Sequence, residues 1–557
     1  MEAIANKQIL TKLKKNFGSA IIFMSLILSS FGYFFNCPMI SLLAVLMLAG
    51  NNLIYSFLDL KRNIVFAIFH VCFFIFLLGR FVVSGIFSYD GAYHGLFEMS
   101  FPSRVVLKML LYLYISLLAI FVAYFRQQFF YLSDTELSPT LKQSYGLLGY
   151  KLPLHDKTIA TKSMISLFLK KSFASSRKTL LSFERKFWSL FFKKSDDEEL
   201  EAVIDRQNFK KLCKKIALAF FYFTSTFEII YVVNLISFTR KVGYNISYLL
   251  PNQWAGSIIF LLGSMYDISL FTYISLEKRA KKSISPIILY LLIGVLYLLA
   301  GRRKEFMLNF LIIITYIVLQ VKDNKLLWKR IILPMLLLVP ILIIALELVG
   351  KARQGSAAGA SSIVVIILSF FYNQGVSARV IGHSIVHRNR IPRFKFYSIG
   401  TIIEFIRYKL IGNYILGNPV PSGQSIERAT EGHLFSQAIA WLSNSEDYLK
   451  GVGTGSSYVA ELYVDFHIFG IIIGSLIYGK LMIYFTKQLQ SKKFVVCIFT
   501  YLMVRGFYFT PRSGFVSFIT TAFSPRQILG LLIILLITYA LNVFLNLKKL
   551  KAFEPRK

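Results

Sequence analysis

Long apolar runs separated by short, mostly basic segments extend along the chain from residue 17 to residue 547. Each run is close to the length of about 20 residues that an apolar helix needs to cross the hydrocarbon core of a membrane. Only helices and closed barrels satisfy the backbone in lipid, and these runs lack the alternation of barrel strands. We therefore predict an all-α fold, a polytopic membrane bundle of about 12 transmembrane helices. The predicted spans are residues 17–35, 38–58, 64–87, 105–125, 216–238, 254–275, 286–300, 306–321, 331–349, 460–485, 494–509 and 527–547.

Composition supports this class of protein. Hydrophobic residues make up 55% of the 557 residues and the mean hydropathy is +0.59, which is more apolar material than one soluble core can bury. The formal net charge of +35 also occurs in nucleic-acid-binding proteins, but no zinc, helix-turn-helix or RNA-binding pattern accompanies it. We interpret the charge as a determinant of membrane topology and of attraction to anionic lipids, and we expect no nucleic acid partner.

The cysteines and the first residues predict no processing or cross-linking. All four cysteines lie in or beside apolar runs, without paired spacing in an external loop, so we expect neither a disulfide framework nor a zinc site. Residues 1–16 are basic and precede an apolar run, but they lack a small-residue cleavage site. This pattern favours an uncleaved first helix over a removable signal.

Lys and Arg residues are distributed unevenly between alternate connecting segments. If the N-terminus is cytoplasmic, most of the 63 Lys and Arg residues fall in cytoplasmic segments, as the positive-inside rule requires. The basic segment 548–557 then also ends inside the cell. We predict a multi-pass protein of the cell membrane with both termini in the cytoplasm.

Two long polar loops divide the chain into five predicted parts. Transmembrane helices 1–4 occupy residues 1–125, a basic cytoplasmic loop with amphipathic helices occupies 126–215, and helices 5–9 occupy 216–349. An external, Arg-rich helical lid follows at 350–459, and helices 10–12 complete the chain at 460–557.

The lid contains one apolar run, residues 363–372. We judge it too short to span. A span here would also invert everything after it and place Lys487, Lys492 and Lys493 outside. We therefore expect the lid to consist of helices packed at the outer surface.

The turn Gly301–Glu305 is basic although it is predicted to lie outside. The turns one span before it, 277–282, and one span after it, 322–330, are also basic. Successive turns alternate sides of the membrane, so all three cannot be cytoplasmic. The run before this turn is also short for a span, so we expect the turn to be recessed below the outer surface. Its charges therefore require an explanation other than insertion signalling.

Arginines are frequent in the predicted external segments. A guanidinium group presents a planar fork that matches phosphate oxygens, so this set predicts an anionic ligand, most simply a diphosphate. Arg505 lies within a predicted span, where an ionisable residue is a functional candidate, although a side chain snorkelling to lipid phosphates is the alternative. The predicted diphosphate-binding residues are Arg302, Arg303, Arg353, Arg379, Arg505 and Arg512.

Two residues are candidates for a general base. Glu461 and Asp465 are four residues apart, on one face of a helix that follows the segment Gly451–Gly455. For Glu461, a role in the first turn of a helix capped by Ser456 or Ser457 is the alternative. His433, in an external loop, is the second candidate.

Cofactor and metal signatures are missing from the sequence. His383 and His387 have the spacing of metal ligands, but no third ligand is evident, and we predict no metal. The chain has no external Asp-x-Asp element and no nucleotide-binding fingerprint, which disfavours a sugar-nucleotide donor and predicts no cofactor.

The layout resembles the O-antigen polysaccharide polymerase (Wzy) family, including its capsule and exopolysaccharide members. The resemblance depends on the Gly301–Glu305 turn, on Gly453–Ser457 leading into Ala460–Tyr463, on Phe469–Gly474 and on the late Arg-rich lid. Relatives often have a glycine soon after the Tyr-rich stretch, whereas His467 intervenes here, and the long loop at 126–215 departs from the usual layout.

The resemblance implies a glycosyltransferase that joins undecaprenyl-diphosphate-linked oligosaccharide repeat units at the outer face of the membrane, without a metal. It implies that Arg302, Arg303, Arg353 and Arg379 stabilise the leaving diphosphate, with Arg505 and Arg512 as second choices, and that Glu461 or His433 is the base. The expected partners are the lipid-linked donor and acceptor glycans, membrane lipids, a chain-length regulator and a flippase.

Two other functions share parts of this pattern. A ligase of similar architecture would transfer finished glycan to another acceptor. A lipid-linked oligosaccharide flippase or transporter would carry charges along a central cavity, whereas here the charges within predicted spans are few.

Overall fold

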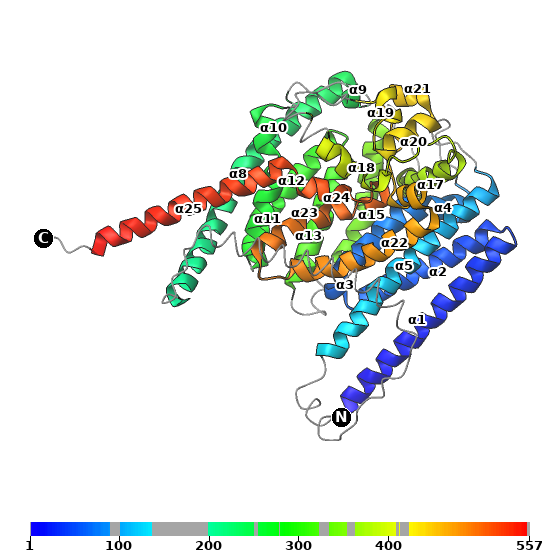
Figure 1. The fold of residues 1–557 in the computed structure, drawn as a ribbon, viewed down its shortest axis with the longest axis horizontal. Coiled ribbons are helices and arrows are strands. Elements are labelled where there is room, and N and C mark those ends of the chain that lie inside the picture. Colours follow the sequence, from blue (N-terminus) through cyan, green and yellow to red (C-terminus); the bar gives the residue numbers. More distant parts are fainter. Residues whose placement is uncertain are drawn as a thin grey trace. The chain divides into compact units, whose positions relative to one another are not determined.

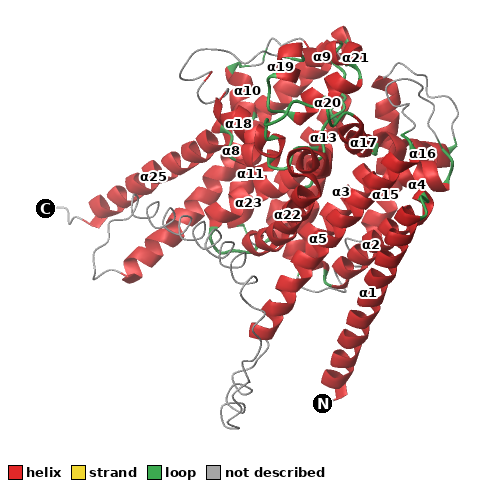
Figure 2. Cartoon of the chain, turned by 45° about the vertical axis from the view of Figure 1, so that its right-hand side comes forward, coloured by secondary structure: helices red, strands yellow, loops and turns green. Residues whose placement is uncertain are grey.

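The protein was analysed as a computed structural model, and every regular element in its described part is helical (Figures 1 and 2). The structure describes residues 2–89, 101–135, 199–244, 246–249, 254, 256–277, 279–321, 333–353, 362–407, 412 and 423–553. The first half contains α1 (Glu2–Phe34), α2 (Pro38–Leu58), α3 (Leu60–Phe73), η1 (Phe74–Leu78), α4 (Gly79–Ile86), α5 (Ser103–Thr135), α8 (Glu199–Val242), α9 (Ile246–Leu249), α10 (Ile258–Gly263), α11 (Tyr266–Leu276), η2 (Ala280–Ser283) and α12 (Ile284–Leu299). The second half contains α13 (Arg303–Gln320), α15 (Leu333–Arg353), α16 (Ile363–Gln374), α17 (Val376–Val386), α18 (Tyr397–Glu404), α19 (Ile426–Thr430), α20 (Phe435–Ser443), α21 (Ser445–Leu449), α22 (Tyr458–Leu489), α23 (Phe494–Phe507), η5 (Thr510–Arg512), α24 (Ser517–Ala522) and α25 (Pro525–Phe553).

Nine helical units in the described part are long and apolar enough to cross a membrane. Large apolar side chains stay exposed along them, as at Leu292 and Leu536, which is expected of surfaces that face lipid. The protein is therefore a polytopic, multi-pass membrane protein, as the sequence predicts. The nine units are 38–58, 60–86, 103–125, 207–242, 258–276, 281–299, 363–386, 458–489 and 517–546, and shorter apolar helices occupy 18–34, 337–349 and 494–507.

Two of these findings differ from the sequence-based list of spans. The run 363–372 does not stop as expected: α16 and α17 together form a unit of 24 residues, 363–386, that is long and apolar enough to span. The expectation that this run is too short is thus wrong, because the helix resumes after the break at Gly375. Conversely, α13 has 18 residues but begins with three charged ones, and it is not among the nine units. The placement of 350–459 as an external lid stays a prediction.

The chain forms two compact units. The first contains residues 1–127 and 217–531, and the second contains 128–216 and 532–557. Residues 136–198 lie outside the described part, so the amphipathic helices predicted in the basic loop are not described there. All the candidate site residues belong to the first unit.

Aromatic rings join α3, α22 and α23 in the core of the first unit. Phe69 of α3 stacks on Phe507 of α23 with ring centroids 5.1 Å apart, and Tyr478 of α22 lies 4.8 Å from the same Phe507 ring. The hydroxyl of Ser116 in α5 bonds those of Tyr458 (2.7 Å) and Ser475 (2.8 Å), both in α22. This packing fixes the start of α22 and the end of α23, where two of the predicted site residues lie.

Candidate active site

Glu461 is buried in the first turns of α22 and holds a loop. Its side chain is only 3% exposed. One carboxylate oxygen accepts the Ser456 hydroxyl (2.7 Å) and the other accepts the backbone N–H of Phe515 (2.8 Å). Ser456 thus donates to the carboxylate, whereas the capping interpretation expected its oxygen to accept a helix N–H. Glu461 therefore fixes the segment 513–515, directly after Arg512.

Asp465 acts on a different element from Glu461. Its two oxygens accept the backbone N–H groups of Tyr397 (3.1 Å) and Ser398 (2.7 Å) at the start of α18. A carboxylate at a helix N-terminus satisfies otherwise unpaired N–H groups and the positive end of the helix dipole. The two carboxylates of α22 thus attach two separate segments to the same helix end.

The basic turn itself is shaped by Gly301. This residue has a φ of +78° and follows the end of α12, where its N–H donates to the Leu298 carbonyl (2.8 Å). The N–H of Arg302 donates to the Tyr297 carbonyl (2.8 Å). A left-handed glycine is the usual way to end a helix, and here it allows α13 to begin immediately with Arg303.

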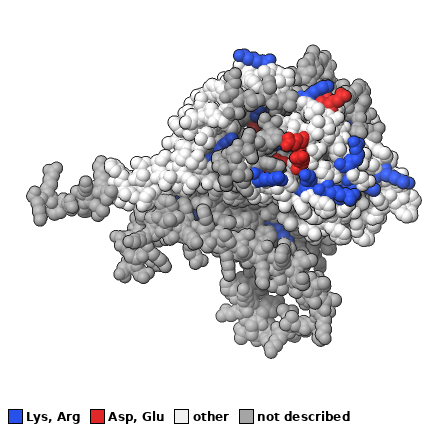
Figure 3. All heavy atoms as spheres, turned by 45° about the horizontal axis from the view of Figure 1, so that its top comes forward, with Lys and Arg blue, Asp and Glu red and all other residues white. Residues whose placement is uncertain are grey.

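Lys304 and Arg512 are brought together by two aromatic rings. The Lys304 ammonium lies 4.9 Å from the centroid of Phe509, the Arg512 guanidinium lies 5.6 Å from that of Phe76, and the two rings are 5.5 Å apart. Cations over aromatic faces gain electrostatic stabilisation. Lys304 and Arg512 are 208 residues apart in sequence (512 − 304), so two distant segments contribute positive charge to one place. On the face drawn in Figure 3, several patches of Lys and Arg side chains lie around a smaller group of acidic side chains.

Arg512 is also held by the break between α16 and α17. Its guanidinium donates to the side-chain oxygen of Gln374 at 2.9 Å. On the other side of this break, Arg379 of α17 is 6% exposed and interacts electrostatically with Arg80 and Tyr372. Arg80 donates to the Tyr372 hydroxyl (2.6 Å) and lies 3.9 Å above its ring.

Gly375 makes this arrangement sterically feasible. A Cβ at this position would lie 2.5 Å from the Cβ of Arg80 and 2.7 Å from its backbone nitrogen. Only glycine therefore allows the break to approach α4 so closely. Arg80 was not among the predicted site residues, although an arginine within a predicted span was a signal for it.

Arg303 points to α15 and ends on Glu347. Its Nη1 donates to the Leu346 carbonyl (3.0 Å) and lies 3.9 Å from a Glu347 oxygen. The other Glu347 oxygen accepts from Ser369 (2.6 Å) and Asn373 (2.8 Å) of α16, next to Gln374. Glu347 is 1% exposed. Through these contacts it connects the basic turn to the α16–α17 break. The sequence analysis missed it, although a carboxylate within the apolar run 331–349 could have identified it.

Arg505 has internal partners on two helices. Its Nη2 donates to Glu305 (2.7 Å) and to the Asn309 side-chain oxygen (2.8 Å), and its Nη1 lies 3.5 Å from Asp267 of α11. The side chain is 6% exposed. The structure therefore places Arg505 between α23, α13 and α11, which differs from both a snorkelling side chain and a solvent-facing ligand. Arg353 ends α15, and its side chain lies outside the described part.

His433 lies against α18 with one ring nitrogen engaged. Its Nδ1 is 2.6 Å from the Lys395 carbonyl, so Nδ1 carries the proton and donates. Its backbone N–H donates to Glu404 (3.0 Å), and Gly400 allows the His433 carbonyl to contact α18 directly. In this tautomer Nε2 is the basic nitrogen, and none of the residues that the structure describes bonds to it. A ring nitrogen in this state is able to accept a proton.

The helix α18 links His433 to the Glu461 region. Thr401, next to Gly400, approaches Gly514, where a Cβ would lie 3.4 Å from Thr401 Cγ2 and 3.1 Å from a Glu461 oxygen. The structure thus brings His433, Glu461 and the segment that carries Arg512 to one region. The candidate site is built from α13, the α16–α17 break, α18, the start of α22 and η5.

His383 and His387 stack with ring centroids 5.8 Å apart. Burial and the nearby Arg390 lower the pKa of His387, which favours the neutral ring. No group of three His, Cys, Asp or Glu side chains that could hold a metal occurs in the described ranges.

Comparison with known proteins gives one match. A family model described as O-antigen polysaccharide polymerase Wzy matches residues 17–145 and 179–542, which include all the predicted site residues. No curated protein and no solved structure shows significant similarity to the chain.

Proposed function

The chain belongs to the O-antigen polysaccharide polymerase Wzy family, glycosyltransferases that polymerise lipid-linked repeat units, and from this premise we propose its reaction. It joins undecaprenyl-diphosphate-linked oligosaccharide repeat units at the outer face of the bacterial cell membrane. The product is a capsule, exopolysaccharide or O-antigen type of glycan.

One new glycosidic bond forms in each cycle. A sugar hydroxyl of one lipid-linked unit attacks the anomeric carbon of the glycan on a second lipid. The bond from that carbon to the diphosphate breaks, and undecaprenyl diphosphate leaves with the electron pair. The hydroxyl proton passes to a base on the protein. A diphosphate is a good leaving group that needs charge stabilisation more than protonation, which fixed cations supply.

Arg512, Arg379 and Arg302 are the proposed ligands of the leaving diphosphate. Supporting this, Arg512 and Lys304 flank one pair of aromatic rings, and Arg379 lies with Arg80 across the break from Gln374. Arg353 stays a candidate on the basis of its sequence position.

We assign Arg303 and Arg505 a structural role, not a role in binding the diphosphate. Both are tied to carboxylates, Arg303 to the buried Glu347, and Arg505 to the buried Asp267 and the partly exposed Glu305. A guanidinium that already neutralises a buried carboxylate is costly to withdraw from it. We assign these two residues to holding the Gly301–Glu305 turn in place, so that Arg302 and Lys304 are presented to the ligand.

His433 is our first candidate for the base and Glu461 the second. The Nδ1–H of His433 is fixed on the Lys395 carbonyl, which supports a basic Nε2. Both oxygens of Glu461 already accept hydrogen bonds, from Ser456 and Phe515. We therefore favour a positioning role for Glu461, in which it holds the segment that follows Arg512.

The observation that carries the proposal, beyond family membership, is the contact series Lys304–Phe509–Phe76–Arg512. It gathers cations from segments that are distant in sequence around one pair of aromatic rings.

The test is reconstitution. Purified protein in detergent should elongate preformed lipid-linked repeats and release undecaprenyl diphosphate, and the double variant Arg379→Ala, Arg512→Ala should not. A matched control is Arg240→Ala with Lys241→Ala, an exposed pair at the end of α8. Wild-type protein that binds but never elongates the substrate would support a flippase. Cells lacking the protein should accumulate single lipid-linked repeats, whereas accumulation of long lipid-linked chains would support a ligase.

A further inference from the structure

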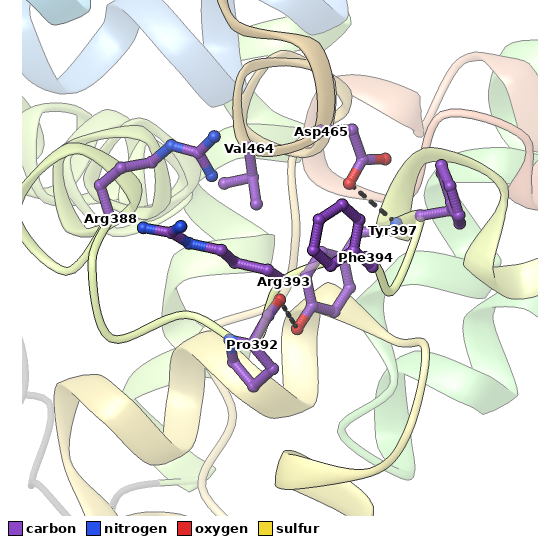
Figure 4. Close-up of a pocket in the computed structure, with 8 residues that line it drawn as sticks. Arg388, Pro392, Arg393, Phe394, Tyr397, Val464 and Asp465 are labelled. Carbon is purple, nitrogen blue, oxygen red and sulfur yellow. Dashed lines mark hydrogen bonds between the residues drawn. The ribbon is translucent and has the colours of Figure 1, made fainter.

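A pocket with two arginines in its lining lies between the segment after α17 and the first part of α22. Its volume is about 140 Å³, and Arg388, Arg393 and Phe394 line one side of it, with Asp465 on the other (Figure 4). None of these residues belongs to the set assigned above to the leaving diphosphate. The side chains of both arginines extend into the same space (Figure 4).

Arg388 is held in place and still accessible. Its Nη2 lies 3.0 Å from Nε2 of His467, and its guanidinium lies 5.7 Å from the ring centroid of Tyr463. Its side chain is half-buried, whereas Arg393 is exposed. A cation fixed before ligand binding loses less conformational entropy on binding than a free side chain does.

The backbone around the pocket is unusually strained. Of the five residues other than glycine with positive φ in the described chain, three lie here: Phe394 (+59°), Phe396 (+49°) and His467 (+55°). His467, with a ψ of −147°, adopts a conformation that glycine normally occupies. Such conformations persist only where the surroundings hold them, and they gather at ligand clamps and active sites. Here Asp465 stabilises the backbone after Phe396, because its carboxylate accepts hydrogen bonds from the Tyr397 and Ser398 N–H groups.

Exposed aromatic side chains lie in and next to the segments that form the pocket. Phe394 and Phe396, which line it, are 87% and 45% exposed. Phe466 and Phe469 follow Asp465 in α22 and are 49% and 74% exposed, in the first half of the candidate membrane span 458–489. Two cations near exposed aromatic side chains of a candidate span suit an amphipathic ligand with an anionic head.

We propose that Arg388 and Arg393 bind the phosphate-bearing headgroup of the second lipid-linked substrate, while Phe394, Phe466 and Phe469 contact its apolar chain. This inference rests on the proposed function, because joining two lipid-linked units requires two diphosphate groups to be held at once. Arg379 and Arg512 serve the leaving one, and this pocket holds the other.

The test counts bound headgroups. Full-length protein in phosphatidylcholine nanodiscs is labelled with a photoreactive farnesyl diphosphate, and mass spectrometry gives the stoichiometry and the labelled peptides. Wild-type protein should bind two equivalents and be labelled within 388–397 or 464–469. Arg388→Ala with Arg393→Ala should bind one equivalent and lose this labelling, and Arg379→Ala with Arg512→Ala should lose the other equivalent. Because a charged hydrogen bond is removed, affinity at the altered site should fall about tenfold or more.

Two further variants test whether a loss of labelling comes from misfolding or from the change in net charge. Arg393→Ala alone removes an exposed side chain, so it should fold normally and still weaken labelling. The exposed pair Arg240→Ala and Lys241→Ala has the same change in charge and should bind two equivalents.

The outcomes separate this inference from the proposed function. If wild-type protein polymerises repeats and the Arg388, Arg393 variant does so with unchanged stoichiometry and KM, only the pocket assignment fails. If wild-type protein neither polymerises nor binds the probe, both fail. Displacement of the probe from this pocket by an equal amount of phosphatidylglycerol would assign the pocket to bulk anionic lipid and overturn the substrate assignment.

Discussion

Arg505 of α23 donates a hydrogen bond to Glu305 of α13 at 2.7 Å, and the arginine is only 6% exposed. The same guanidinium lies 3.5 Å from Asp267. Removing one partner of a buried ion pair leaves the other charge uncompensated, at a cost of about 3–5 kcal/mol. The pair therefore links the basic turn to the helix that packs beside it.

Replacing Arg505 by Ala should destabilise the protein even without substrate. The buried Asp267 and the partly exposed Glu305 would then lose this counter-charge, so we expect a clear fall in Tm, measured by thermal unfolding in detergent. Adding Glu305→Gln to Arg505→Ala should recover part of the loss, because one uncompensated charge is then removed. An Arg505→Ala protein with the wild-type Tm but no affinity for a prenyl diphosphate would instead make Arg505 a substrate ligand.

Glu347 should couple the basic turn to Arg512. Glu347→Ala removes the acceptor of Ser369 and Asn373 and the partner of Arg303, so we expect lower polymerisation activity than in the control Glu446→Ala, which changes an exposed carboxylate. In a double-mutant cycle, Glu347→Ala and Arg512→Ala should be non-additive by about 0.5–3 kcal/mol in transition-state free energy. Strict additivity of the two changes would show that Glu347 does not act through Arg512.

Gly375→Ala should be far more damaging than Gly50→Ala. A Cβ at 375 meets the backbone of Arg80, which cannot move aside, whereas a Cβ at 50 meets nothing within 4 Å. We expect a loss of about 1–3 kcal/mol in stability at 375 from overpacking, and no loss at 50. Thermal unfolding of the two variants, purified side by side, measures the difference. Equal Tm values would contradict the close approach of α4 to the break.

The helices could be predicted from the sequence because the signal for a span is local. An apolar run of sufficient length identifies a helix without reference to any other part of the chain. The break at Gly375 shows where this reasoning ends. Asn373, Gln374 and Gly375 look like the end of the run 363–372, and only the contact with Arg80 shows why the chain continues as a second helix.

The sequence predicts the residue types of the candidate site but not their pairings. It identifies the arginines as candidate ligands of an anion, which stays a prediction, and it does not show which of them already has a partner. Arg303 finds Glu347 and Arg505 finds Glu305 across 44 and 200 residues of chain, and such pairs depend on tertiary packing alone. The sequence alone could therefore not distinguish Arg512, a proposed ligand of the diphosphate, from Arg505, which forms an internal ion pair.

Glu461→Gln should affect polymerisation activity much less than Glu461→Ala. A glutamine amide can accept the Phe515 N–H with its oxygen and donate to Ser456 with its nitrogen, so the segment after Arg512 stays fixed. We expect Glu461→Gln to retain activity within a few-fold and Glu461→Ala to lose most of it. The measurement is the initial rate of polymer formation at saturating lipid-linked repeat. A loss of about 10²-fold or more in the glutamine variant would make Glu461 the base instead.

His433→Asn should remove the proposed basic nitrogen, Nε2, while keeping the local structure. The asparagine amide N–H can occupy the position of Nδ1–H and donate to the Lys395 carbonyl, but nothing replaces Nε2. If Nε2 accepts the hydroxyl proton, kcat should fall by about 10²–10⁴-fold with little change in Tm or in binding of a prenyl diphosphate. His433→Ala opens space at the same point, so added imidazole should restore part of its rate, whereas it should not help Arg512→Ala. Normal turnover by the asparagine variant would exclude His433 as the base and leave Glu461 as the remaining candidate.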